Sequence, residues 1–187
     1  MSESAHASAP AEPPDRPRDE LASLAGQFRH AATGVQARLR RVNPCRDGRG
    51  AVFETELLLH GARLQPRDDE DRRRWALVLH CLALADGRHD SRAAGEPGAV
   101  LQRLSFKEGR LRQLLEADFD VLVDLMPRVA RRLGAAGATV NWWPLAELLL
   151  HTGTGDPVRR NRADAARRRL VEHYLQAAPR ETSADVS

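Results

Sequence analysis

Residues 106–152 read FKEGRLRQLLEADFDVLVDLMPRVARRLGAAGATVNWWPLAELLLHT, and this stretch decides the fold that we expect. Leucines recur at helical spacing over residues 111–115, and a second apolar stripe follows at positions i, i+3, i+4, i+7 and i+11 from Leu122 to Leu133. This spacing gathers apolar side chains on one side of a helix and leaves the other side to solvent. The pattern therefore predicts two amphipathic helices.

The second predicted helix carries a basic face. Arg128, Arg131 and Arg132 lie at i, i+3 and i+4, so they share a side of the helix that is turned away from the apolar stripe. Pro127 lies inside the same helix and removes one backbone hydrogen bond. We expect either a kink at this position or two shorter helices.

A turn and a third helix complete the stretch. Gly134 and Gly137 are expected to end the second helix, because glycine readily adopts the left-handed conformation that closes helices. Asn141 is a candidate cap for the next helix, and Pro144 falls in its first turn, where a missing N–H costs little. The apolar face of this third helix is formed by Trp142, Leu145, Leu148 and Leu149.

The whole chain has the composition of one helical domain. Its 187 residues are 42% hydrophobic and only 4% aromatic, and Leu, Ala and Arg dominate over the β-branched residues of sheet proteins. We predict an all-α, single-domain bundle of about seven to nine helices with a basic face, over residues 20–177. Residues 1–19 and 178–187 are expected to be disordered tails, because they lack an apolar period.

Six further helices are expected, two of them short and over residues 35–42 and 99–104. The first of the six, over residues 20–31, has an apolar face of Leu21, Leu24, Ala25 and Phe28. A helix over residues 51–64 is expected to give Val52, Phe53, Leu57 and Leu64 to the core. A helix over residues 70–85, with Asp68 and Asp69 as caps, has almost no polar face and should be the buried central helix. The last helix, over residues 156–177, starts with Asp156 as its cap and should project basic side chains from its first half.

Motifs for catalysis or metal binding are absent from the sequence. The glycines match no phosphate-binding loop, and no GxSxG elbow occurs. Cys45 and Cys81 form neither a zinc motif nor a disulfide framework, and His89-Asp90 lies in a Gly-rich loop without the further ligands of a metal phosphohydrolase. We expect no enzymatic activity, no cofactor and no metal.

The sequence also lacks a membrane span and a signal peptide, since no run of about 18 apolar residues occurs. We expect a cytoplasmic protein. Its 29 basic and 26 acidic residues are unevenly placed: residues 1–20 and 180–187 hold seven of the acids and three of the arginines, which leaves 26 basic against 19 acidic residues in the helical region. Such an excess suggests nucleic acid as a partner, although a GC-rich genome would also favour arginine over lysine.

The order of these segments resembles the CasB family, the small subunit of the type I-E CRISPR surveillance complex Cascade. GVQARLRRV is followed by RRRWALVLHCLAL, then by PGAVLQRLSFKEGRLRQLLEA, the leucine/arginine helix and NWWPLAELLLH. The likeness covers roughly residues 20–175, and residues 105–150 are its best marker. Two features depart from the family pattern, Pro127 and the segment HTGTGDPV.

The resemblance implies an all-helical protein without catalytic activity, present in two copies beside the backbone and large subunits of Cascade. It also implies contacts to crRNA, to the target strand and to the displaced DNA strand, which stabilise the opened R-loop in antiviral defence. Together with the basic face described above, it gives the candidate nucleic-acid-binding residues Arg40, Arg41, Arg72, Arg73, Lys107, Arg110, Arg128, Arg131, Arg132, Arg159, Arg160 and Arg162.

Other interpretations remain open at this point. The acids at residues 68–71 could simply neutralise Arg72 and Arg73, and the arginines near residue 40 could be a solvated helix end. A helical transcriptional regulator would use the turn at residues 133–141 and the helix after it as a helix-turn-helix, but WWPLAELLL offers nothing that reads base edges. A pure scaffold would pair its arginines only with protein acids. Salt-sensitive binding to nucleic acid distinguishes the scaffold from the other two.

Overall fold

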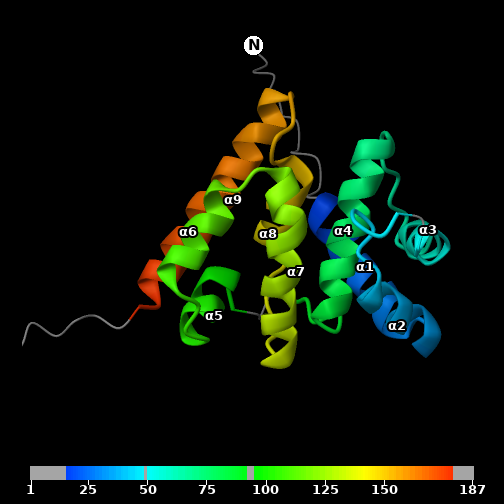
Figure 1. The fold of residues 1–187 in the computed structure, drawn as a ribbon, viewed down its shortest axis with the longest axis horizontal. Helices are drawn as coiled ribbons and strands as arrows, with labels where there is room; N and C mark the ends of the chain where they lie inside the picture. Colours follow the sequence, from blue (N-terminus) through cyan, green and yellow to red (C-terminus); the bar gives the residue numbers. More distant parts are fainter. Residues whose placement is uncertain (1–15, 49, 92–94, 179–187) are drawn as a thin grey trace, which may run out of the picture.

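A computed structural model describes residues 16–48, 50–91 and 95–178. Within these residues every regular element is a helix, and the only β-type pairings are isolated bridges that join His89 and Gly95 to Val140 (Figure 1). The all-α prediction is confirmed. The helices are α1 (Arg16–His30), α2 (Thr33–Arg41), α3 (Val52–Gly61), α4 (Asp69–Leu84), α5 (Pro97–Arg103), α6 (Glu108–Glu116), α7 (Phe119–Ala135), α8 (Trp143–His151) and α9 (Pro157–Gln176).

The first helix is longer than its apolar pattern predicts. It begins at Arg16, so residues 16–19 are helical rather than disordered. Its predicted apolar face is confirmed, because Leu21, Leu24 and Phe28 are buried in the core. The rest of the predicted N-terminal tail, residues 1–15, lies outside the described residues, as do residues 179–187 of the predicted C-terminal tail.

The core is built around α4 and α8. Every residue of α4 from Arg74 to Ala83 is buried, which confirms its prediction as the central helix. α4 packs against α2, α7 and α8, while α9 covers α5 and α8. In α8 only Glu147 is not fully buried. A helix enclosed in this way does not enter a major groove, so it is not the recognition helix that a regulator would need.

The helix ends follow the local sequence closely. Asp68 caps α4 by accepting a hydrogen bond from the Asp71 amide at 2.7 Å, and Asp156 caps α9 by accepting one from the Val158 amide at 2.8 Å. Gly137, with φ of +62°, adopts the predicted left-handed turn after α7. Asn141 binds the Trp143 amide at 3.1 Å, one residue before the N-cap position of α8.

Two glycines let helices cross at short distance. A Cβ at Gly98 would overlap the backbone carbonyl of Leu170, and a Cβ at Gly134 would overlap that of Leu84. The first crossing brings α5 against α9, and the second brings α7 against α4. Neither contact leaves room for a side chain.

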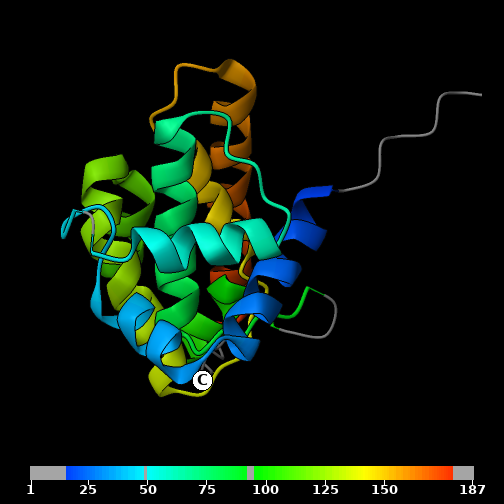
Figure 2. The same ribbon diagram turned by 90° about the vertical axis from the view of Figure 1, so that its right-hand side faces the viewer.

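The prediction for the inner face of α3 is wrong. Val52, Phe53 and Leu57 are 51%, 75% and 49% exposed, whereas Leu58 and Leu59 are buried together with Leu64 beyond the helix. α3 lies across the outer side of the bundle, where α1 and α2 contact it (Figure 2). Since the apolar and polar residues of α3 are spread around the helix without a one-sided stripe, its sequence does not define which side faces the core.

Of the two outcomes expected at Pro127, a kink or two shorter helices, the second is excluded, because α7 runs without interruption from Phe119 to Ala135. Pro127 has no N–H to offer the carbonyl oxygen of Val123, its i−4 partner. The side chain of Asn43 donates to that oxygen instead, at 3.3 Å. Next to it, Arg46 forms two hydrogen bonds with Asp124, at 3.0 and 2.7 Å. The segment after α2 therefore compensates for the proline and fastens itself to α7.

We expect Asn43→Ala to lower the free energy of unfolding by about 1–2 kcal/mol, since it leaves the Val123 carbonyl without its donor. The same change should cost less in a Pro127→Ala background, where the alanine N–H bonds Val123 itself. Urea unfolding of the wild type, both single variants and the double variant gives the coupling. An equal cost of Asn43→Ala in both backgrounds would show that the two residues do not act together.

Candidate nucleic-acid interface

A groove between α6 and α7 holds the densest group of candidate residues. The two helices meet at residues 117–118 and diverge from there, so that the N-terminal end of α6 stands apart from the C-terminal half of α7 (Figure 1). The space between them has a volume of about 290 Å³. We call it the α6–α7 groove; its lining includes Phe106, Arg110, Gln113, Leu114, Leu125, Arg128, Val129 and Arg132.

The groove has an apolar floor and a basic rim. Leu114 and Val129 are almost completely buried, and Leu125 is half-buried beside them. Arg110 and Arg128 are exposed, and neither makes a hydrogen bond or an ion pair with the described residues. Beside the hydrogen bond from Arg46, the nearby charge of Arg128 helps to lower the pKa of the Asp124 carboxyl. Arginine side chains without an internal partner keep all their donors available for a ligand.

Arg132, unlike Arg110 and Arg128, is held by a hydrogen bond within the fold. Its guanidinium donates to the backbone carbonyl of Leu104, just after α5, while its Nε is buried without a partner among the described residues. Arg131, one position earlier, is exposed, and within the described part of the chain it has neither a hydrogen bond nor an ion pair. Lys107 is exposed at the N-cap position of α6. The structure thus brings together five candidates along α6 and α7.

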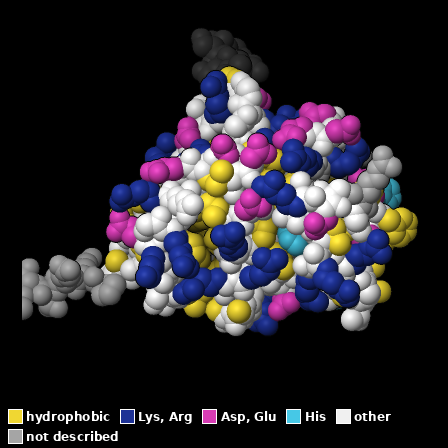
Figure 3. Space-filling view, viewed as in Figure 1, with side chains coloured by type: hydrophobic (Ala, Val, Ile, Leu, Met, Phe, Trp, Pro, Cys, Tyr) yellow, Lys and Arg dark blue, Asp and Glu magenta, His cyan; other side chains and the backbone are white. Residues whose placement is uncertain are grey.

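Figure 3 shows the same face with side chains coloured by type. Basic side chains crowd its lower half, with hydrophobic ones between them, whereas acidic side chains gather in its upper half. In Figure 1 the lower half holds the C-terminal half of α7, and the upper half holds the first turn of α4. The basic face is therefore separated from most of the acids that could neutralise it.

The two candidates on α2 have different surroundings. Arg40 donates to the Ala83 carbonyl at 3.1 Å, pairs with Asp86 at 2.9 Å and lies over the ring of Phe28. Arg41 is exposed and lines a shallow hollow at the end of the helix with Arg38. Arg40 serves the packing of α2 on α4, and Arg41 faces solvent.

The arginines in the first turns of α4 lie close to acidic side chains, which is one of the interpretations that the sequence left open. Arg72 pairs with Glu56 and Asp69, both at 3.0 Å. Arg73 lies 3.9 Å from Glu70 and stacks near the Phe119 ring. Nearby acids therefore satisfy the Arg72 guanidinium, as the sequence allowed, whereas Arg73 has only a long ion pair and the ring contact.

The three candidates on α9 differ in burial and in their partners. Arg159 is only 13% exposed and pairs with Asp71 at 2.6 Å, so it belongs to the interior. Arg160 and Arg162 are exposed and, among the described residues, form no ion pair. They lie in the first turns of α9, near the top of Figure 1 and away from the C-terminal half of α7. They form a second basic patch rather than an extension of the α6–α7 groove.

A family model described as CRISPR-associated protein Cse2 matches residues 35–174, from α2 to α9. The chain belongs to the Cse2 family. This confirms the resemblance to the CasB proteins and identifies the chain as a subunit of the type I-E Cascade complex. No curated protein and no solved structure matches it.

The described residues of this Cse2-family chain contain no group of three His, Cys, Asp or Glu residues placed to hold a metal ion. His89 is buried, and its Nδ1 accepts a hydrogen bond from the Trp142 amide at 3.1 Å. Cys45 and Cys81 are free thiols. None of the helices in this part of the chain is long and apolar enough to cross a membrane.

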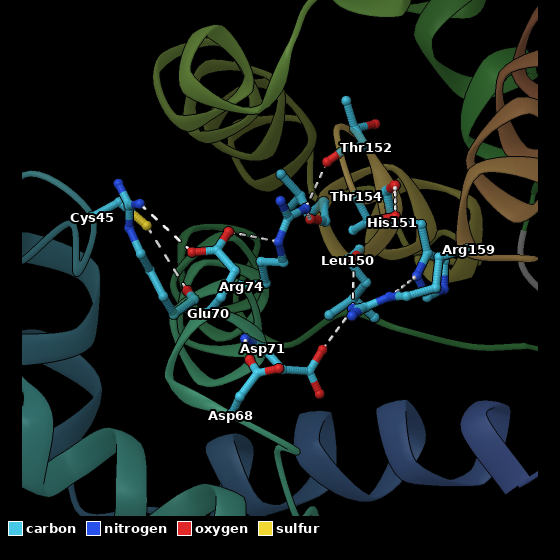
Figure 4. A network of polar contacts seen from close by, with 12 residues as sticks. Cys45, Asp68, Glu70, Asp71, Arg74, Leu150, His151, Thr152, Thr154 and Arg159 are labelled. Carbon is cyan, nitrogen blue, oxygen red and sulfur yellow. Dashed lines mark hydrogen bonds and ion pairs between the residues drawn. The ribbon is translucent and has the colours of Figure 1, made fainter. Parts of the chain in front are cut away.

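In this Cse2-family chain, a buried polar network joins α4, α8 and α9 near the first turn of α4 (Figure 4). The Arg74 guanidinium donates to Glu70 at 2.8 Å and to the carbonyls of Leu149 and Thr152 at 2.9 and 2.8 Å. Its Cζ atom lies 4.0 Å from the centroid of the Phe119 ring. Arg74 therefore belongs to the core, unlike its neighbours Arg72 and Arg73.

The second part of the network centres on Arg159. Its Nη2 donates to Asp71 at 2.6 Å and to the Leu150 carbonyl at 2.8 Å, and its Nε donates to His151 Nδ1 at 3.2 Å. Burial and the charges of Arg159 and Arg162 lower the pKa of His151 to about 4. A neutral imidazole is needed here, because a protonated ring cannot accept from Arg159.

We expect the protein to lose stability as the pH falls from about 6.5 to about 4. In this window the unfolded chain protonates His151 at its ordinary pKa while the folded chain keeps it neutral, so protons favour unfolding. Melting temperatures recorded between pH 7.5 and 4.5 should decline less in His151→Gln, which keeps an acceptor but does not titrate. Burial also lowers the pKa of His80 and His89, so part of the decline should persist. Identical slopes for the two proteins would exclude His151 as a cause.

Sequence reasoning missed three residues of structural importance, Arg74, Asn43 and Arg46. A signal existed for Arg74, because it shares a helical face with Val78 and Cys81, which are buried. No local signal existed for Asn43 and Arg46, whose partners on α7 lie 80 and 78 positions further along the chain.

Proposed function

We propose that this Cascade subunit binds nucleic acid without catalysing a reaction, contacting the crRNA–target duplex region and the displaced DNA strand. The observation that carries the proposal is a group of three exposed arginines on α6 and α7 that form no hydrogen bond or ion pair within the described chain. Arg110 and Arg128 line the α6–α7 groove, and Arg131 lies on α7 outside its lining. A pure scaffold would have no use for unpaired guanidinium groups gathered on one face. Phosphate is the ligand that their planar fork fits best.

Such contacts suit the energetics of R-loop formation. Base pairing with the guide supplies sequence recognition, and the heteroduplex that forms is about as stable as the DNA duplex that it replaces. A few charge-assisted contacts to the phosphates of the open state are then enough to shift the balance. The protein need not read any base edge for this purpose.

The contacts that each of the twelve candidates makes within the fold separate proposed binding residues from structural ones. We assign the primary surface to five residues along α6 and α7, a second patch to two exposed residues of α9, and a separate exposed position to α2. Arg40, Arg72, Arg73 and Arg159 are engaged by internal acids and carbonyls, and we assign them mainly to stability. The primary surface consists of Lys107, Arg110, Arg128, Arg131 and Arg132, the second patch consists of Arg160 and Arg162, and the separate position is Arg41.

The proposal is tested by a tagged pull-down from the native host, with protein identification and RNA sequencing. The expected result is recovery of the backbone and large subunits of Cascade, of repeat-derived guide RNA and of two copies of this chain per complex. The purified chain should also bind single-stranded DNA with an affinity that falls as salt rises. Recovery of the chain alone, or with duplex promoter DNA, would overturn the proposal.

A further inference from the structure

We propose that the α6–α7 groove holds a nucleobase of an unpaired strand, with the base against the apolar floor and the flanking phosphates on the arginine rim. This inference rests on the proposed function and makes it more specific. Phosphate recognition alone requires only a charged surface. The groove adds an apolar hollow to that surface, and this hollow is the feature that needs an explanation.

The α6–α7 groove is large enough for one flat ligand, and its floor is apolar. The volume of the groove, about 290 Å³, is near the lower end of the range for small-molecule pockets, and a single base is a small ligand. Leu114 and Val129 close it from below, and Leu125 remains partly exposed on its wall. Each base has an apolar face that loses contact with water when it rests on such a surface.

The rim supplies the matching charges. Arg110 on α6 and Arg128 on α7 stand on opposite sides of the floor, and both are exposed without a hydrogen bond or ion pair in the described chain. Arg132 adds a second observation, because its buried Nε has no acceptor among those residues. A buried donor without an acceptor is costly, and a base or phosphate oxygen would satisfy it once the Arg132 side chain turns toward the groove that it lines.

The geometry favours an unpaired strand over a duplex. In a duplex the base faces are covered by their stacked neighbours, so an apolar floor would have nothing to contact. In an unpaired strand the faces are free. The floor consists mainly of aliphatic side chains, which agrees with the scarcity of exposed aromatic residues and makes hydrophobic contact, rather than aromatic stacking, the source of affinity.

The test compares a short single-stranded deoxythymidine oligonucleotide with its fully abasic counterpart of the same length, using the purified full chain. Both carry the same phosphates, so both should show the same salt dependence. We expect the abasic strand to bind about five- to twenty-fold more weakly, because it lacks the base contact. Leu125→Gln should weaken binding of the normal strand to a similar degree and leave the abasic strand unaffected.

Val158→Gln serves as the matched control, since Val158 is 62% exposed on α9 and does not line the groove. It should change neither affinity. Equal affinities of the wild type for the two strands would overturn the base-binding inference but leave phosphate binding intact. A competition with an acidic, apolar peptide gives a further test. If the peptide displaces the normal strand but leaves binding of the abasic strand unchanged, the base-binding inference is overturned and the floor is assigned to a protein partner. Absence of salt-dependent binding to either strand would instead defeat the proposed function.

Discussion

Asp71→Ala is expected to destabilise the fold by about 3–5 kcal/mol, because it leaves a buried arginine without its counter-charge. The Asp71 and Arg159 side chains are only 7% and 13% exposed, and their closest atoms are 2.6 Å apart. Arg74 lies close enough to Arg159 for the two positive charges to repel each other. Without Asp71, this repulsion and the cost of burying Arg159 are no longer offset.

Urea unfolding of the full chain measures the effect, and Asp69→Ala is its matched control. Asp69 lies in the same helical turn, but its side chain is fully exposed, so its removal should leave the unfolding midpoint close to that of the wild type. The double variant Asp71→Ala plus Arg159→Leu should recover much of the loss, since it removes both charges together. If Asp71→Ala behaves like Asp69→Ala, the network of Figure 4 does not hold α9 in place.

The features that the sequence predicts well are local ones. The stripe of α7 and the cap of α4 depend on residues within a few positions of each other, and both are found as expected. Arg128 faces solvent because it is fixed by the same periodicity that buries Val129 and Met126. For these residues the spacing within one helix determines the environment.

The features that escape prediction depend on contacts between distant segments. In the sequence Arg159 is one more basic residue of α9, but in the structure it pairs with Asp71, which lies 88 positions earlier in the chain. Phe53 has a hydrophobic side chain on an apolar helix, and only the packing of α1 and α2 decides that it points outward. Charge and hydrophobicity alone do not separate a binding arginine from a structural one, because this difference is made by the tertiary neighbours.

The division between binding and structural arginines leads to the second large expected effect. The triple variant Arg110→Ala, Arg128→Ala and Arg131→Ala should bind single-stranded DNA about 100-fold more weakly at low salt, since each charge-assisted contact contributes on the order of 1 kcal/mol. The slope of log affinity against log salt should fall by about 2, because three phosphate contacts are lost. The fold should remain intact, as none of the three side chains bonds to the described chain.

A charge-matched comparison separates position from net charge. Arg160→Ala, Arg162→Ala and Arg168→Ala remove three exposed arginines from α9, away from the α6–α7 groove. If general attraction to a basic protein causes binding, both triple variants lose affinity equally. If the α6–α7 groove is the primary surface, the first variant loses far more than the second, and target binding by the assembled Cascade complex follows the same order. Circular dichroism and unfolding midpoints equal to those of the wild type ensure that the difference arises from lost contacts.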